Sequence, residues 1–272
     1  MKKITSTIFA ILVFAGVSAQ KLPNVQQSSV KAPAIVKIDG KADEWGAFKA
    51  FNAATDAFYS LANSENRLYL IVQTANYNIT NKVTRGGLTL TVNANAQKDG
   101  APASSITFPL IEPAELRGIV QSMRDVMENS SAGDADALTL AANKKLAGGI
   151  KLIKASGLKN VSDSLISIYN EQGIKAAAAL SQKGILTCEF EIPLTLLNLR
   201  GDQFSYNIKL NGPKLRPVQV PVYIPELEGN KAPVNVFKGQ GVVAGKDMTR
   251  QQAEMVATTL STDFSAEYKL AK

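Results

Sequence analysis

The sequence predicts a mainly β protein, an antiparallel β-sandwich with a helical insertion around residues 112–148 and a helix near the C-terminus. Short runs of alternating apolar and polar residues recur along the chain, with turn signals about every ten residues, as in sandwich folds. The insertion instead places apolar residues three and four positions apart, which is a helical spacing. The regular alternation of strands and helices that a parallel sheet requires is missing from the sequence.

The N-terminal half contains the first predicted strands. Residues 57–63 and 68–76 flank the turn SENR and predict an antiparallel hairpin. In residues 87–94, leucine and valine alternate with threonine, so one face is apolar. The other runs with strand character in this half are 34–38 and 104–110.

Residues 112–148 predict two helices against one side of the sheets. Pro113 suits the first turn of a helix, and the apolar residues from Leu116 to Met127 form a single stripe. A second, shorter helix is expected within 137–147. We interpret the methionines of the stripe as core packing rather than as a cofactor site.

Strand patterns return in the C-terminal half. We expect Cys188, the only cysteine, to be a small buried hydrophobic residue of its strand. One helical turn is expected at 194–199, a long loop at 213–247 and a helix at 248–260. The predicted strands are 163–170, 173–181, 184–193, 202–212 and 263–270.

The N-terminus is typical of a secretory signal peptide, here residues 1–19, with two lysines, an apolar run and small residues at 17–19. An extended leader (20–33) and a single sandwich domain (34–272) would follow. We therefore expect a periplasmic or secreted protein; the alternative is a retained anchor helix. No later stretch has the roughly 18 apolar residues of a membrane span.

Composition restricts the function. The chain has no histidine, which removes the commonest general base and the commonest transition-metal ligand. Its net charge of +7 becomes +5 without the two lysines of residues 1–19, and the basic residues are too scattered to predict nucleic-acid binding. We expect no enzyme activity. A two-carboxylate glycosidase would need acids such as Glu189 and Glu191, which the strand pattern places opposite Phe190, toward solvent.

The stretch IDGKADEW (38–45) resembles the start of family 9-like carbohydrate-binding modules, which are related to DOMON-type sandwiches. SENRLYLIVQTAN (64–76), CEFEIPLTLLNL (188–199) and FSYNIKLNG (204–212) are similar to later strands of those modules, in the same order. The resemblance covers about 34–75 and 184–212. It implies a jelly-roll or DOMON-like sandwich in which Trp45 packs beneath the first strand as a structural pin. The alternative is a ligand platform.

The resemblance also suggests sugar binding, but a single tryptophan cannot form the paired clamp associated with family 9 modules. Loop tyrosines with polar neighbours are the substitutes. Each could equally be an ordinary half-buried loop residue. The candidate ligand-binding residues are Tyr77, Arg85, Tyr223 and Glu226.

Acidic turns in sandwiches often hold calcium, so Asp39, Asp43 and Glu44 are candidate calcium ligands, although solvated turn acids are the simpler interpretation. Asp134 and Asp136 form a weaker candidate. Haem, known from DOMON relatives with Met and His ligands, is discounted because the chain lacks histidine.

Two functions remain. The first is an exported, non-catalytic binding module for a carbohydrate or another cell-envelope ligand. The second is a structural or interaction protein of the envelope without a small-molecule site. An aromatic-lined concavity would favour the first, and a flat polar surface the second.

Overall fold

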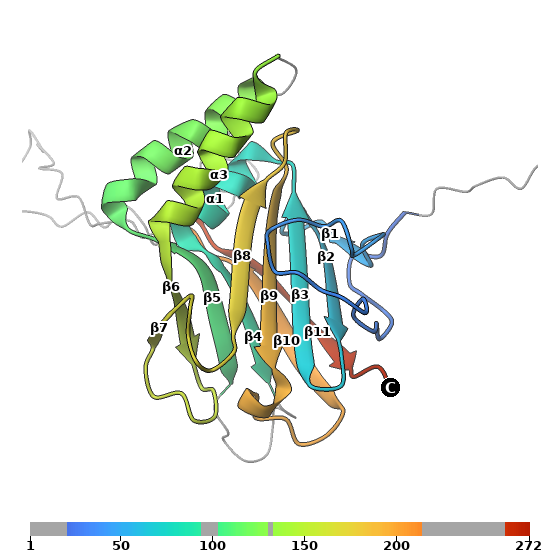
Figure 1. Cartoon of the computed structure of the whole chain (residues 1–272). Coiled ribbons are helices and arrows are strands. Elements are labelled where there is room, and N and C mark those ends of the chain that lie inside the picture. Colours follow the sequence, from blue (N-terminus) through green and yellow to red (C-terminus); the bar gives the residue numbers. More distant parts are fainter. Residues whose placement is uncertain (1–20, 94–102, 130–132, 214–258) are drawn as a thin grey trace, which may run out of the picture.

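A computed structural model describes residues 21–93, 103–129, 133–213 and 259–272 of the chain. Within these ranges, two antiparallel sheets of five and six strands account for most of the regular structure, with three α-helices at one end (Figure 1). This confirms the predicted mainly β fold and is consistent with a β-sandwich.

The five-stranded sheet has the order β1-β2-β3-β9-β8, with all neighbours antiparallel. The predicted hairpin forms its centre, because β2 pairs with β3 across the turn that precedes Arg67. Its strands are β1 (Ala50–Asn52), β2 (Ala57–Asn63), β3 (Arg67–Thr74), β8 (Lys175–Leu180) and β9 (Leu186–Pro193).

The six-stranded sheet has the order β11-β10-β4-β5-β6-β7 and is also antiparallel throughout. The last strand of the chain is therefore an edge strand beside β10. Its strands are β4 (Leu88–Asn93), β5 (Ser104–Ile111), β6 (Ile150–Ser156), β7 (Leu165–Ser167), β10 (Gln203–Leu210) and β11 (Thr262–Lys269).

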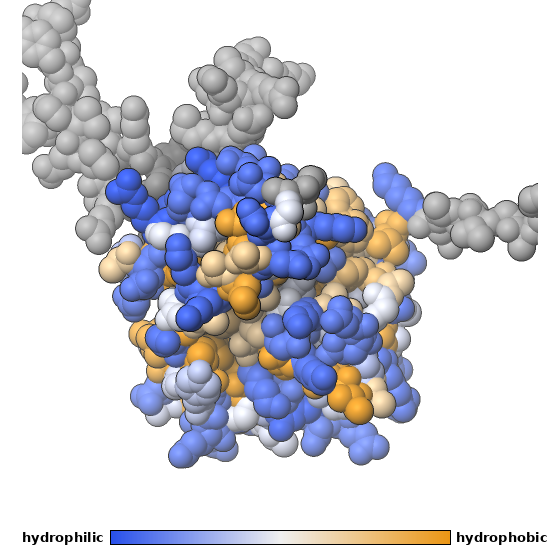
Figure 2. Space-filling model, turned by 45° about the horizontal axis from the view of Figure 1, so that its top comes forward, coloured by the Kyte–Doolittle hydropathy of each residue, from blue (hydrophilic) through white to orange (hydrophobic). Residues whose placement is uncertain are grey.

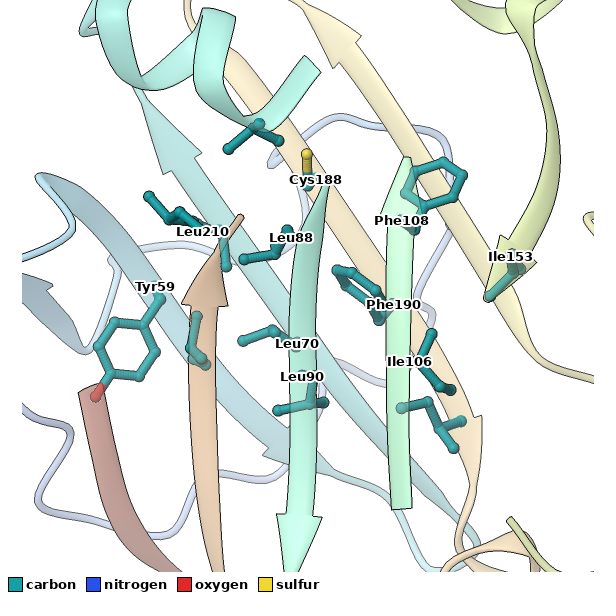
Figure 3. Packing of buried hydrophobic residues seen from close by; sticks show 14 of the residues in the cluster. Tyr59, Leu70, Leu88, Leu90, Ile106, Phe108, Ile153, Cys188, Phe190 and Leu210 are labelled. Atoms are coloured by element: carbon teal, nitrogen blue, oxygen red, sulfur yellow. The ribbon is translucent and has the colours of Figure 1, made fainter. Parts of the chain in front are cut away.

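Both sheets contribute to one apolar core (Figure 3). The ring of Phe190 from β9 meets that of Phe108 from β5 edge to face, with centroids 6.1 Å apart. The hydroxyls of Tyr59 in β2 and Tyr206 in β10 are hydrogen bonded at 3.0 Å, also across the two sheets. Cys188 lies in this core, as expected, and burial raises the pKa of its thiol to about 12.

The helical insertion forms as predicted. It consists of α2 (Pro113–Glu128), with the proline in its first turn, and α3 (Ala135–Gly149). The two helices pack against each other at one end of the sheets, beside the shorter helix α1 (Tyr77–Gly86) (Figure 1). The 3-10 helix η1 (Leu194–Leu196) supplies the predicted helical turn after β9.

Helix α3 also contacts the outer edge of the five-stranded sheet. The Asn143 side chain accepts a hydrogen bond from the Leu180 N–H at 2.8 Å and donates one to the Leu180 carbonyl at 2.9 Å. Leu180 belongs to β8, which is an edge strand. One amide side chain therefore pairs with both backbone groups of that residue.

Residues 21–33 contain no strand but are bound to β2 and to β11, the last strand of the chain. The Gln26 side chain exchanges two hydrogen bonds with the backbone of Leu61 in β2. The Tyr268 hydroxyl of β11 donates to the Val30 carbonyl at 3.0 Å. The segment predicted as a leader thus connects strands from the two sheets.

The predicted strand at 34–38 is not formed, and the strand predicted at 163–170 is reduced to β7. Residues 34–47 instead cross the outer face of the five-stranded sheet as an irregular segment. Residues 1–19, with the predicted signal peptide, lie outside the described residues, as do nearly all of the loop and the C-terminal helix predicted for 213–260.

Candidate functional site

Helix α1 was not predicted, and it changes the setting of Tyr77 and Arg85. The Asn76 side chain caps its N-terminus by accepting a hydrogen bond from the Asn78 N–H at 2.8 Å. Gly87, with φ of 81°, ends the helix and donates its N–H to the Val83 carbonyl. Tyr77 is therefore the first residue of a helix rather than a loop residue.

A cleft of about 510 Å³ lies between α1 and α2. Helix α1 contributes Tyr77, Asn81 and Arg85, which are four residues apart and therefore share one face of the helix. The side chains that α2 contributes include Leu116, Arg117, Val120, Gln121 and Arg124. Figure 2, which turns the helical end toward the viewer, shows a mostly hydrophilic surface with hydrophobic residues between the polar ones.

Contacts across the cleft join the two helices. The guanidinium carbon of Arg124 lies 5.4 Å from the centre of the Tyr77 ring, and its Nε donates to the Tyr77 hydroxyl at 3.1 Å. The hydrogen bond with Tyr77 raises the pKa of Arg124 above its ordinary value, so this side chain stays charged. On α1, the Nε of Arg85 donates to the Asn81 side chain at 2.7 Å.

The cleft is electropositive. Its lining includes three arginines and no carboxylate within the described residues. Among the described residues, Arg124 has its Nε 3.8 Å from Glu128, an exposed contact worth little, and the charge of Asp125 also acts on it. Among the predicted ligand-binding residues, the structure thus brings Tyr77 and Arg85 together. Tyr223 and Glu226 lie outside the described residues.

A buried lysine lies on a neighbouring side of α1. The Lys82 side chain is fully buried, and its Nζ donates to the Thr262 hydroxyl at 3.1 Å. Burial lowers the pKa of this amine to about 8. Lys82 faces the start of β11 and does not line the cleft.

Trp45 lies outside the shared core, so its expected position inside the sandwich is wrong. Its indole Nε1 donates at 2.7 Å to Glu189, whose side chain points away from Phe190 and the core. The ring meets Tyr69 edge to face at 6.2 Å. Through these two contacts, Trp45 holds residues 34–47 against the outer face of the five-stranded sheet.

Glu189 is fully buried, which contradicts the expectation that it faces solvent. In addition to the Trp45 indole, the backbone N–H groups of Gly40 and Asp39 donate to its carboxylate at 2.7 and 3.1 Å. Gly40 has φ of +80°, and a Cβ there would lie 2.6 Å from the backbone N of Ala179. The close approach of the segment to the sheet is what excludes water from Glu189.

Glu191 also differs from the expectation, because it is 4% exposed. Its carboxylate forms ion pairs with Arg67 at 3.0 Å and Lys175 at 3.2 Å. Both acids that a glycosidase mechanism would have used are thus bonded to protein groups and covered. Sequence alternation placed them on the correct face, but it carried no sign of the segment that covers Glu189.

We expect the free energy of unfolding to fall as the pH rises from about 4.5 to about 7, because of Glu189. Burial raises its pKa from 4.5 to about 7, while Glu44 adds to the rise and the three hydrogen bonds limit it. In this window the folded chain keeps a proton that the unfolded chain has lost. Removing that proton should cost roughly 2–3 kcal/mol of stability.

Urea unfolding at several pH values would test this. Glu189→Gln has no titrating proton and should show a flatter pH profile, whereas Glu65→Gln, at an exposed turn position, should keep the original slope. Parallel profiles for the original chain and Glu189→Gln would contradict the assignment.

The predicted calcium ligands are placed as turn residues. The Asp39 side chain accepts from the Lys41 N–H at 3.0 Å, and the Glu44 side chain accepts from the Lys37 N–H at 2.7 Å. In the part of the chain that the structure describes, no three Asp, Glu or Cys side chains are grouped so that they could hold a metal ion. Calcium binding stays a prediction.

Among the described helices, none has the length and apolar character needed to cross a membrane. No protein-family model matches the sequence, and no curated protein matches it either.

Proposed function

We propose that this chain is an exported, non-catalytic binding protein and that its ligand, a carbohydrate or another component of the cell envelope, occupies the α1–α2 cleft. The observation that carries the proposal is the convergence of Tyr77, Arg85 and Arg124 from two helices on one cleft of about 510 Å³. This volume is within the range of about 300–1,000 Å³ that is usual for ligand pockets.

Chemistry supports a binding role. The cleft offers an aromatic ring together with amide and guanidinium donors, which is the mixture that binds hydroxylated or charged ligands. The absence of histidine argues against acid–base catalysis of the commonest kind. The resemblance of residues 38–45 to family 9-like modules favours a carbohydrate, and the N-terminal sequence favours export.

The second candidate is a structural or interaction protein of the envelope. It is favoured by the position of Arg124, which already lies over the Tyr77 ring and restricts the ring face on which a sugar could stack. In this case the arginine and the tyrosine act mainly to hold α1 against α2.

Binding measurements on residues 20–272 would separate the candidates. A glycan array, with and without Ca²⁺, should identify a ligand, and calorimetry should then show that Tyr77→Ala with Arg85→Ala weakens its binding by about tenfold or more. Tyr169→Ala with Lys159→Ala is the matched control, since both residues are exposed and neither lines the cleft. Silence across the array would favour the structural role, and equal weakening by the control pair would contradict the site.

A further inference from the structure

The chemistry of the cleft indicates which class of ligand it selects. Arg85, Arg117 and Arg124 are all exposed, and the cleft lining contains no acid within the described residues. Three positive charges that line one concave surface attract anions to it, although Glu128 and Asp125 already offset part of the charge of Arg124. A guanidinium group binds carboxylate and phosphate oxygens through two parallel N–H donors, and a sulfate ester presents its oxygens in the same tetrahedral arrangement as phosphate.

Two of the arginines are oriented by their own helix or by the neighbouring one. Arg85 uses its Nε on Asn81, and Arg124 uses its Nε on Tyr77. Each side chain is thus held through Nε; among the described residues, the carboxylate that lies within 4 Å of either guanidinium is that of Glu128, 3.8 Å from the Nε of Arg124. Because these side chains are already held in place, they lose less rotamer freedom when a ligand binds, which lowers the entropic cost of binding.

The spacing favours a ligand with more than one anionic group. Arg117 and Arg124 are seven residues apart on α2, which corresponds to about 10 Å along the helix axis. Arg85 approaches the cleft from α1 on the other side. A small single anion would reach one of these groups, whereas an extended chain with repeated charges can contact all three.

We propose that the ligand of the α1–α2 cleft is an acidic glycan, whose carboxylate or sulfate-ester groups are bound by Arg85, Arg117 and Arg124. This inference rests on the proposed function, because it names the class of glycan that the same cleft binds. The Tyr77 ring lies against the Arg124 guanidinium, and the Asn81 amide is available as a donor for hydroxyl groups. The Gln121 amide donates one N–H to Asp125 at 2.9 Å and has a second N–H to offer.

The test uses chemically matched probes on residues 20–272. One pair is an oligogalacturonate and the same oligosaccharide with its carboxylates reduced to alcohols; the other is a sulfated galactan oligosaccharide and its desulfated, neutral form. We expect calorimetry to show that an acidic member binds at least about tenfold more tightly than its neutral partner. This preference should shrink as NaCl rises from about 50 to about 300 mM.

Replacing the three arginines by glutamine (Arg85→Gln, Arg117→Gln, Arg124→Gln) should abolish the preference. Lys159→Gln, Lys151→Gln and Lys154→Gln together remove the same charge from exposed positions away from the cleft and should leave it intact. The exposed positions of all six side chains make unfolding of either variant unexpected, and melting curves would verify this.

The outcomes separate this inference from the proposed function. Equal binding of neutral and acidic partners, lost in Tyr77→Ala, would overturn the acidic ligand and support carbohydrate binding at the cleft. Silence of both pairs and of neutral glycans would overturn both. If inorganic sulfate competes as effectively, mole for mole, as the acidic oligosaccharide, the site binds simple anions and the glycan proposal is overturned. The proposal is also overturned if the triple lysine variant loses the preference for the acidic oligosaccharide as completely as the triple arginine variant does.

Discussion

Phe190→Ala is expected to lower the free energy of unfolding by about 3–5 kcal/mol. Phe190 is fully buried in β9, between β3 and β8, and its ring meets Phe108 of the other sheet. Truncation would remove apolar contacts from both sheets and leave a cavity that the surrounding strands cannot close. Urea unfolding followed by circular dichroism would measure the loss.

Phe58→Ala provides the matched comparison. Phe58 is 38% exposed in β2 and touches the rings of Phe48 and Phe51 at the margin of the same sheet. Phe58→Ala should lower the free energy of unfolding by less than half as much as Phe190→Ala, because a partly exposed side chain buries less apolar area on folding. Equal losses for the two variants would contradict the placement of Phe190 at the centre of the shared core.

Glu189→Ala is expected to cost about 2–4 kcal/mol at neutral pH and to release residues 34–47 from the sheet. The variant removes the acceptor for the Trp45 indole and for two backbone N–H groups. These donors can regain partners only by turning toward water, which requires the segment to lift. The loss of the desolvated carboxylate offsets part of the cost.

The single tryptophan makes this release directly measurable. Trp45 is the only tryptophan in the chain, so its fluorescence reports on this segment alone. Glu189→Ala should shift the emission maximum to longer wavelength and increase quenching by iodide, and Glu65→Ala should do neither. Reduced stability with unchanged emission would show that other contacts hold the segment.

Much of the fold follows from local sequence patterns. Alternation located strands such as β4 and β10, because each has one face on the core and another with more polar residues, whereas the short strand β1 was not predicted. Helix α2 was predictable from the apolar stripe and Pro113, and α3 contains the second helix that was expected within 137–147. The prediction of a strand at 34–38 was wrong, because this segment does not pair with a neighbouring strand.

The candidate site was only half predictable. Tyr77 and Arg85 were selected as a tyrosine with polar neighbours, but α1 itself was missed because Asn and Thr disfavour helix interiors. Its signals were Asn76 as N-cap, the buried pair Ile79 and Val83 four residues apart, and the double glycine at its end. The contact of Arg124 with Tyr77 could not be predicted from local sequence patterns, because the two residues belong to different helices.

The burial of Glu189 shows a second limit. Its partners Asp39 and Gly40 lie about 150 residues earlier in the chain, in a segment without regular structure. No periodicity encodes such a contact, because it depends on how an irregular chain crosses a completed sheet. The resemblance at IDGKADEW and the acidic residues of the turn marked this stretch as a feature of interest, but neither indicated that it covers Glu189.

The pairing of Asn143 with Leu180 has a consequence for self-association. Open backbone groups along an outermost strand can recruit a strand from a second molecule and so start aggregation. Here an amide side chain takes the place of that foreign strand at one end of β8, with a helix standing beside it. Growth of the five-stranded sheet by addition of another copy is thereby obstructed at the helical end of the domain.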